Sequence, residues 1–271
     1  ATFPASGFIA LFSPATLYLI KLTIRQFLFN LFFSANGWSS KCRVTEGRSM
    51  LNESAVGSVV LDTALHNQIG QKIGSKGLRT RQKLIETTIE LLETHGLRDL
   101  SVADIARAAS TSPATFYVYF EGVPEVLLAA LEHVTQSTPE LVKMAEETWS
   151  DLEQQDRARC FVELYCAHWW RWRTVFRCRN LASEEGDIRF QEARRQSVAP
   201  LIEALTGQIM RAQSKSLVPD NLSPRASAGA ILTLLERLAA VGPLTPEQPD
   251  MSFETLKDAA AYMIAALTVG R

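Results

Sequence analysis

The stretch "LSVADIARAASTSPATFYVYF", Leu100–Phe120, predicts two short helices joined by a tight turn. Ser101 is followed three residues later by Asp104, a spacing typical of a capping box at the start of a helix. Ser112 is a good N-cap for the second helix, and Pro113 is tolerated at the next position because its missing N–H needs no intrahelical partner. Two short helices joined in this way form a helix-turn-helix, whose second helix can lie in the major groove of DNA.

The second of these helices has two chemically different faces. Phe116 and Phe120 are four residues apart, so they share a face that we expect to pack into the core. Tyr117 and Tyr119 flank the other face, where a phenol hydroxyl can reach a phosphate. That face carries small side chains that let the helix backbone lie close to base edges: Pro113, Ala114, Thr115 and Val118.

A basic segment precedes the motif. It has no acidic residue before Glu86, and its cations are Lys72, Lys76, Arg79, Arg81 and Lys83. Cations at the N-terminus of a helix are unfavourable to the helix dipole, and phosphates would compensate for this cost. The alternative interpretation is a solvated basic leader without a ligand. The net charge of −1 for the 271 residues excludes a histone-like protein but leaves room for a basic face.

The N-terminal residues differ from the rest of the chain. Residues 8–33 are apolar and rich in phenylalanine, with Pro14, Lys21 and Arg25 interrupting them. No basic leader marks a secretory signal. Because the chain starts at Ala1 and has Met50 after this segment, we expect residues 1–49 to be upstream-translated sequence; a membrane-associated segment at residues 8–33 is the alternative. Residues 50–75 read as a flexible leader.

The C-terminal half is predicted to form five further helices from about Glu125, with breaks near residues 138–139, 183–187, 215–224 and 243–252. One of them, "CFVELYCAHWWRWRTVFRCRN", Cys160–Asn180, carries an aromatic stripe at helical spacing: Phe161, Tyr165, Trp169, Trp172 and Phe176. The stripe is either bundle core or the wall of an apolar effector pocket, and the pattern alone leaves both open.

Catalytic and metal-binding patterns are lacking in the sequence. We find no nucleophile–base pair, carboxylate dyad or phosphate-binding loop, so an all-α enzyme with a helix-turn-helix-like hairpin is a weak alternative and the prediction is that the chain is not an enzyme. Cys166 and His168 are two residues apart on a helix and face different directions, so no metal site is expected. No cofactor is expected either.

The segment "TRQKLIETTIELLETHGLRDLSVADIARAASTSPATFYVYFEGVPEVLLAAL", Thr80–Leu131, resembles the TetR family of bacterial transcriptional regulators. This resemblance implies an all-α homodimer with an N-terminal three-helix DNA-binding domain at residues 76–123. A helix from residue 124 would link it to a larger ligand-binding and dimerisation bundle, residues 124–271. It also implies a cytoplasmic, ligand-responsive repressor of a pseudo-palindromic operator in double-stranded DNA, released by a small apolar effector.

Residue by residue, the resemblance directs Thr80, Ser101, Tyr117 and Tyr119 toward phosphates, beside the basic Lys76 and Arg79. It directs Ser112, Pro113, Ala114, Thr115 and Val118 toward the groove. It favours a pocket at the aromatic stripe, and assigns the dimer interface to the alanine-rich segments 223–241 and 253–269. Three positions depart from the family pattern. Ser110 replaces a turn glycine, so either a left-handed backbone there is strained or the turn differs slightly from the family pattern. Val123 replaces a phosphate-contacting lysine, and Ala103 offers no arginine for a guanine.

Overall fold

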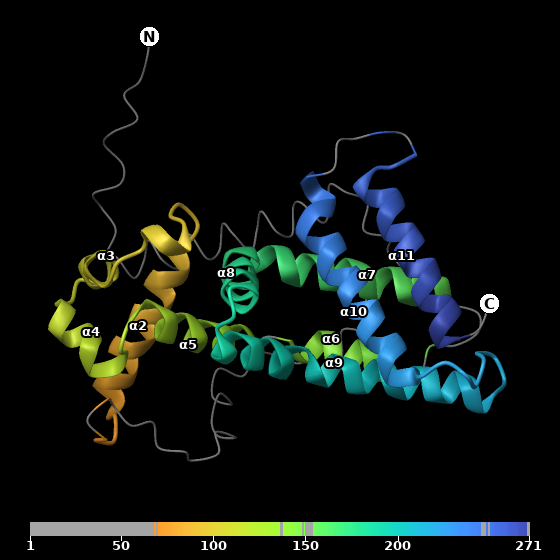
Figure 1. Cartoon of the computed structure of the whole chain (residues 1–271), viewed down its shortest axis with the longest axis horizontal. Coiled ribbons are helices and arrows are strands. Elements are labelled where there is room, and N and C mark those ends of the chain that lie inside the picture. The colour runs from red at the N-terminus through yellow and green to blue at the C-terminus, as the bar shows by residue number, and fades with distance from the viewer. Residues whose placement is uncertain are drawn as a thin grey trace, which may run out of the picture. The chain divides into compact units, whose positions relative to one another are not determined.

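The computed structural model describes residues 68, 70–135, 138–147, 149, 154–244, 248 and 250–269. The expectations for residues 1–49, and for most of the leader at 50–75, therefore lie outside the described residues. Within the described part the fold is all-α, which confirms the predicted class; Figure 1 shows its helices.

The N-terminal head consists of α2 (Ser75–Leu91), a short 3₁₀ turn η3 (Leu97–Asp99), α3 (Val102–Ala108) and α4 (Pro113–Tyr119). Helix α2 contacts both α3 and α4. The head has a small core that excludes water almost completely, formed by Leu84, Ile85, Ile105, Phe116 and Phe120. This core sets the position of α4, because α4 has fewer than two full turns and needs tertiary contacts to be stable.

Helix α5 (Val123–Thr135) connects the head to the C-terminal bundle. It contacts α2 in the head and α8 and α9 in the bundle. Its apolar side chains are buried over most of its length: Val126, Leu127, Ala129, Ala130, Leu131 and Val134. A single helix therefore belongs to the cores of both parts.

The C-terminal bundle contains α6 (Pro139–Glu146), α7 (Gln154–Arg171), α8 (Arg173–Glu184), α9 (Ile188–Ser214), α10 (Pro224–Val241), the 3₁₀ turn η4 (Gly242–Leu244) and α11 (Phe253–Thr268). Helix α9 is central and contacts α5, α6, α8, α10 and α11. Helix α10 is long and apolar enough to cross a membrane by length and composition, but it packs on α7, α9 and α11 as a bundle helix.

The prediction of five helices after residue 125 is wrong, because seven α-helices, α5 to α11, follow residue 122 in the described residues. One missed break is Trp172, which separates α7 from α8 with a non-helical backbone at φ −110° and ψ 20°. The break allows Phe176 to stack on Trp169, with ring centroids 6.2 Å apart. An unbroken helix was expected because no proline or glycine marks this position.

The last residues of the predicted flexible leader are held against the head. The backbone N–H of Gln68 donates to the carbonyl of Val118 at 3.0 Å. Its side-chain amide donates to the carboxylate of Glu125 at 2.9 and 3.0 Å. Ile73 is 9% exposed. These contacts extend the ordered head to the N-terminal side of residue 76.

Candidate nucleic-acid interface and effector pocket

Helices α3 and α4 form the helix-turn-helix, and both begin at the predicted N-caps. The hydroxyl oxygen of Ser101 accepts the N–H of Asp104, and that of Ser112 accepts the N–H of Thr115, at 3.2 and 3.1 Å. In the turn between the helices, the N–H of Thr111 donates to the carbonyl of Ala106 at 2.8 Å. Each cap fixes the first turn of its helix at the predicted position, because it satisfies a backbone N–H that has no intrahelical partner.

Ser110 has a left-handed backbone, with φ 55°. A side chain in this region costs roughly 1–2 kcal/mol, which glycine avoids. Replacing Ser110 by glycine is therefore expected to raise the free energy of unfolding by about 0.5–1 kcal/mol, after the extra entropy of glycine in the unfolded chain is subtracted. Urea denaturation measures this change in the free energy of unfolding. The matched control is Ala108→Gly in helical backbone nearby, expected to lower stability by about 1 kcal/mol; a loss of stability in S110G would contradict the strain.

The two faces of α4 lie as the sequence predicted. Phe116 and Phe120 are 0% and 1% exposed and pack inward. Tyr117 and Val118 are 52% and 39% exposed. Pro113 and Ala114 are also exposed, and Thr115 is half-buried on the same helix. The outward face of α4 is thus small and largely apolar except for hydroxyls at its margin, a surface able to approach thymine methyl groups.

The hydroxyls expected to bind phosphate are partly engaged within the protein. Thr80 donates its hydroxyl to the carbonyl of Lys76 at 3.1 Å and is half-buried. Ser101 and Ser112 serve as caps, as described above, although both residues are exposed. Their side chains therefore fix helix ends first, and a phosphate would have to use the remaining hydrogen-bonding capacity of each hydroxyl.

Tyr119 is half-buried and lies against the first turn of α2. A Cβ placed on Gly77 would be 3.2 Å from the Tyr119 hydroxyl and 2.7 Å from the Ile73 side chain, so the glycine permits this approach. Sequence reasoning missed Gly77, because its role depends on a contact with a residue 42 positions later in the chain. The approach brings the Tyr119 hydroxyl beside the basic start of α2.

The basic segment divides into exposed and half-buried cations. Lys72, Lys76, Arg79 and Lys83 are exposed. Arg81 is different, because its guanidinium lies 5.2 Å from the centre of the Phe120 ring. Burial lowers the pKa of Arg81, with Glu132 and Glu125 acting against that shift. Arg81 therefore packs on the head core, and the other four cations are available to phosphates.

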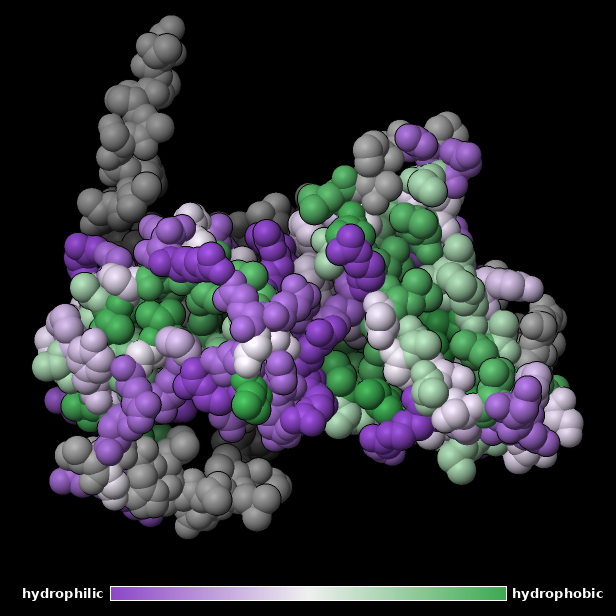
Figure 2. Space-filling model, in the orientation of Figure 1, coloured by the Kyte–Doolittle hydropathy of each residue, from purple (hydrophilic) through white to green (hydrophobic). Residues whose placement is uncertain are grey.

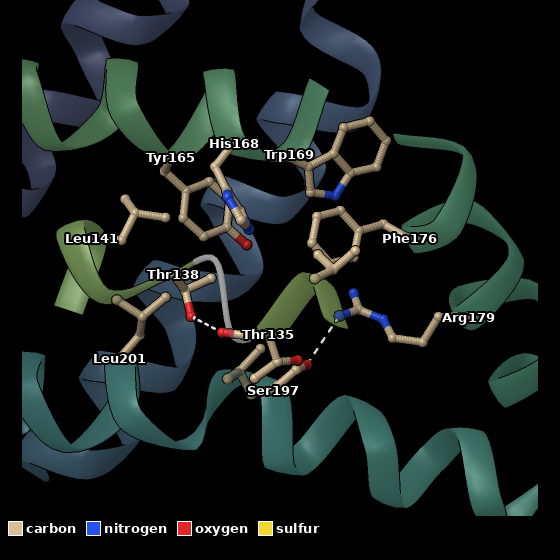
Figure 3. A pocket seen from close by; sticks show the side chains of 12 residues that line it. Thr135, Thr138, Leu141, Tyr165, His168, Trp169, Phe176, Arg179, Ser197 and Leu201 are labelled. Carbon is tan, nitrogen blue, oxygen red and sulfur yellow. Dashed lines mark hydrogen bonds between the residues drawn. The ribbon is translucent and has the colours of Figure 1, made fainter. Parts of the chain in front are cut away.

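A cavity in the C-terminal bundle lies between α5, α6, α7, α8 and α9, and its volume is about 30 Å³. Figure 3 shows the rings of Tyr165, Trp169 and Phe176 on one side of it, facing Thr135, Ser197 and Leu201. The structure thus brings three residues of the predicted aromatic stripe to the cavity. Its other lining residues are Val134, Thr138, Leu141, His168, Arg179 and Val198.

The remaining two stripe residues lie elsewhere. Phe161 is fully buried and packs against Trp149, with ring centroids 6.0 Å apart. Trp172, at the break between α7 and α8, makes an edge contact with His133 of α5 at 6.1 Å. Neither is among the lining residues. Phe161, Tyr165 and Trp169 share helix α7, yet Phe161 is core while Tyr165 and Trp169 line the cavity, so helical spacing alone could not distinguish core from cavity wall.

A charge cluster built on the buried Arg179 borders the cavity. Arg179 is 3% exposed; it forms an ion pair with Glu236 of α10 and donates to Ser197 at 3.1 Å. Arg194 of α9 pairs with the other carboxylate oxygen of Glu236 at 2.5 Å. Burial lowers the pKa of Arg179, and the nearby Glu236 opposes this. The cluster ties α8, α9 and α10 together at the cavity.

His168 is uncharged at neutral pH. Burial, assisted by the nearby positive charge of Arg171, lowers its pKa to about 4. Burial also raises the pKa of Tyr165. Both side chains therefore present neutral polar groups to the cavity. In the described residues no group of three or more histidine, cysteine or acidic side chains is arranged to hold a metal ion.

Two sequence profiles of one family match the two parts of this structure. The profile described as "Bacterial regulatory proteins, tetR family" matches residues 84–130, which contain the helix-turn-helix. The profile described as "Tetracyclin repressor-like, C-terminal domain" matches residues 140–266, which contain the cavity. The chain belongs to the TetR family.

Two curated transcriptional regulators each match about a third of the chain. The transcriptional regulator BetI of Proteus mirabilis (strain HI4320) is 33% identical over 92 residues, which is 34% of this chain and 46% of BetI. EthR of Mycobacterium tuberculosis (strain H37Rv) is 30% identical over 82 residues, 30% of this chain and 38% of EthR. The chain thus spans less than half of the length of these two relatives. Both are transcriptional regulators, in agreement with the expectation that this chain is not an enzyme.

Solved structures extend the likeness to the bundle. The fatty acid degradation regulator FadR from Bacillus halodurans superposes with a TM-score of 0.55 and 14% identity, over 71% of this chain and 97% of that protein. FadR from Bacillus subtilis, solved in complex with stearoyl-CoA, superposes with a TM-score of 0.53 and 13% identity, over 70% and 98% of the two chains. At these identities the likeness establishes the fold alone.

Proposed function

We propose that this chain is a ligand-responsive, DNA-binding transcriptional repressor of the cytoplasm that binds a pseudo-palindromic operator as a homodimer. The observation that carries the proposal is the surface formed by α4 and the start of α2. The small outward face of α4 would enter a major groove, while the exposed cations Lys76 and Arg79 would neutralise phosphates beside it. Tyr119, held against Gly77, lies at the border between these two surfaces.

The proposed dimer interface is the outward face of α10 and α11. Figure 2 shows apolar side chains gathered over these helices. Tyr262 and Met263 of α11 are 56% and 45% exposed. Small exposed residues accompany them and allow close helix approach: Ala226, Ala230 and Ala259. A two-fold axis through this face would place two reading heads on one operator.

The cavity is the proposed effector site. At about 30 Å³ it holds roughly two water molecules, so an effector must widen it. Val134 and Thr135 of α5 line the cavity, and the same helix contacts α2 in the reading head. An effector that fits better when α5 has moved would shift the population toward that arrangement and so change the spacing of the two heads.

Binding to DNA upstream of the gene for this chain tests the proposal. We expect saturation at two protomers per site, an affinity well above that for random DNA, and a steep fall of log K with log salt concentration. The double variant K76Q/R79Q should reduce that slope by about two, because each cation that contacts a phosphate contributes roughly one. Fluorescence anisotropy across a salt series measures both quantities.

The charge-matched control is K143Q/K215Q, which removes two exposed cations of the C-terminal bundle. Its salt dependence should equal that of the unmodified chain. An unchanged slope in K76Q/R79Q, or an equal loss in the control, would contradict the assignment of phosphate contacts to the start of α2.

A further inference from the structure

Two polar atoms in the wall of the cavity lack a partner. In the described part of the chain, the buried side-chain nitrogen and oxygen atoms without a hydrogen bond are His168 Nε2 and Trp169 Nε1. Both residues line the cavity, and Trp169 is only 3% exposed. Buried polar groups in folded proteins nearly always have a partner, so an unpartnered pair beside a cavity indicates a group that is supplied from outside the chain.

Most of the other polar groups of the wall already have a partner within the protein. Thr135, Thr138 and Ser197 donate their hydroxyls to backbone carbonyls at 2.9, 2.6 and 2.9 Å. Arg179 uses all three of its nitrogens, on Asn180, Ser197 and Glu236. A ligand therefore meets open hydrogen-bonding positions on the buried indole and imidazole, and the Tyr165 hydroxyl also faces the cavity.

The charge of the wall is already paired within the protein. Of the described lining residues, Arg179 alone is ionised at neutral pH, and it pairs with Glu236, which it shares with the partly exposed Arg194 outside the wall. His168 stays uncharged because burial lowers its pKa to about 4. An ionised ligand would lose its hydration without gaining an unmatched counter-charge, which is unfavourable in a buried site. The site therefore suits a neutral molecule.

The aromatic residues define the shape of that molecule. Trp169 stacks on Phe176 with an interplanar angle of 26°, and His168 lies 5.7 Å from the same phenylalanine ring. These flat surfaces favour a flat partner, since aromatic rings pack best in offset or edge contacts with one another. A single ring would require the least widening of a cavity of about 30 Å³.

We propose that the effector is a neutral aromatic compound with a hydroxyl group, a phenol in its simplest form, held by the Trp169 N–H and His168 Nε2. The inference rests on the proposed effector role of the cavity and names the chemical class. A phenol hydroxyl accepts from the indole N–H, and it can accept from or donate to the imidazole, so it matches either neutral tautomer of His168.

Calorimetric titration of the full chain with phenol, benzene and sodium benzoate at pH 7 tests this class. We expect phenol to bind at least tenfold more tightly than either benzene or benzoate. Trp169→Phe keeps an aromatic ring but removes the N–H, so it should lower the phenol-to-benzene affinity ratio three- to tenfold, the value of one neutral hydrogen bond. His168→Leu removes the imidazole nitrogen, the second hydrogen-bonding group, and should also lower the phenol-to-benzene affinity ratio.

Trp149→Phe is the matched control. Its indole N–H donates to the carbonyl of Met144 at 3.0 Å, and Trp149 is not among the lining residues. This variant also removes a buried indole N–H, but one outside the cavity, and should leave the phenol-to-benzene ratio unchanged. The phenol and benzene affinities are compared within each variant, so a change in packing that affects both ligands equally does not alter their ratio.

Three results would overturn the inference: equal affinities for phenol and benzene, tighter binding of benzoate, or no binding of any of the three up to millimolar concentrations. Operator affinity is measured on the same samples. If the chain binds the operator but not phenol, the proposed ligand class is wrong and the proposed repressor function stands. If it binds phenol but not the operator, the proposed DNA binding is wrong.

Discussion

Glu236→Gln is expected to lower the free energy of unfolding by about 3–5 kcal/mol, the largest effect among single changes outside the apolar core. Glu236 is the shared partner of two arginines, since one oxygen pairs with Arg179 and the other with Arg194. The neutral amide would leave Arg179, which is 3% exposed, as a buried charge without a counter-ion. Urea denaturation followed by circular dichroism measures the change.

Glu203→Gln is the control, because it breaks an ion pair of the same kind at the surface. Glu203 and Arg225 are 61% and 65% exposed. An exposed pair of this type contributes less than about 1 kcal/mol. Equal losses in the two variants would show that the Arg179–Glu236–Arg194 cluster is solvated in solution and does not hold α8, α9 and α10 together.

Phe116→Ala is expected to destabilise the reading head by about 3–5 kcal/mol and to abolish operator binding. Phe116 is fully buried, and its ring packs against Phe120 with centroids 5.5 Å apart. Removing the ring leaves a cavity under α4, which is too short to be stable without this contact. Denaturation and operator titration of the same sample measure both effects.

Tyr117→Ala removes a neighbouring aromatic ring of similar size as a comparison. Tyr117 is 52% exposed, so the variant should change the free energy of unfolding by no more than about 0.5 kcal/mol. Its effect should appear in DNA affinity alone. Phe116→Ala with normal stability and normal operator affinity would show that α4 is positioned by something other than its buried face.

The helix-turn-helix could be predicted from the sequence because its signals are local. Ser101 and Ser112 each cap an N–H three residues later in the chain. Phe116 and Phe120 are four residues apart, about one turn of the same helix. At Ser110 the resemblance left two readings open, a strained left-handed backbone or a slightly different turn, and the backbone is left-handed. Each of these features depends on contacts between residues close in the chain.

The bundle was less predictable because its features depend on distant residues. No local signal marks the break at Trp172, yet this break puts Phe176 on Trp169. In the head, the contact of Tyr119 with Gly77 and the packing of Arg81 on Phe120 join positions 42 and 39 residues apart. Periodicity shows which residues share a helix face but not which surface that face meets.

The sequence by itself determined the all-α class, the reading head with its inward phenylalanines and outward small residues, and the likeness to the TetR family, because caps, turns and helical periodicity act over a few residues. The tertiary structure decided which aromatic residues line the cavity, which polar atoms there lack partners, and which arginines share Glu236. These features arise where α5 to α10 meet, and packing between distant segments determines them.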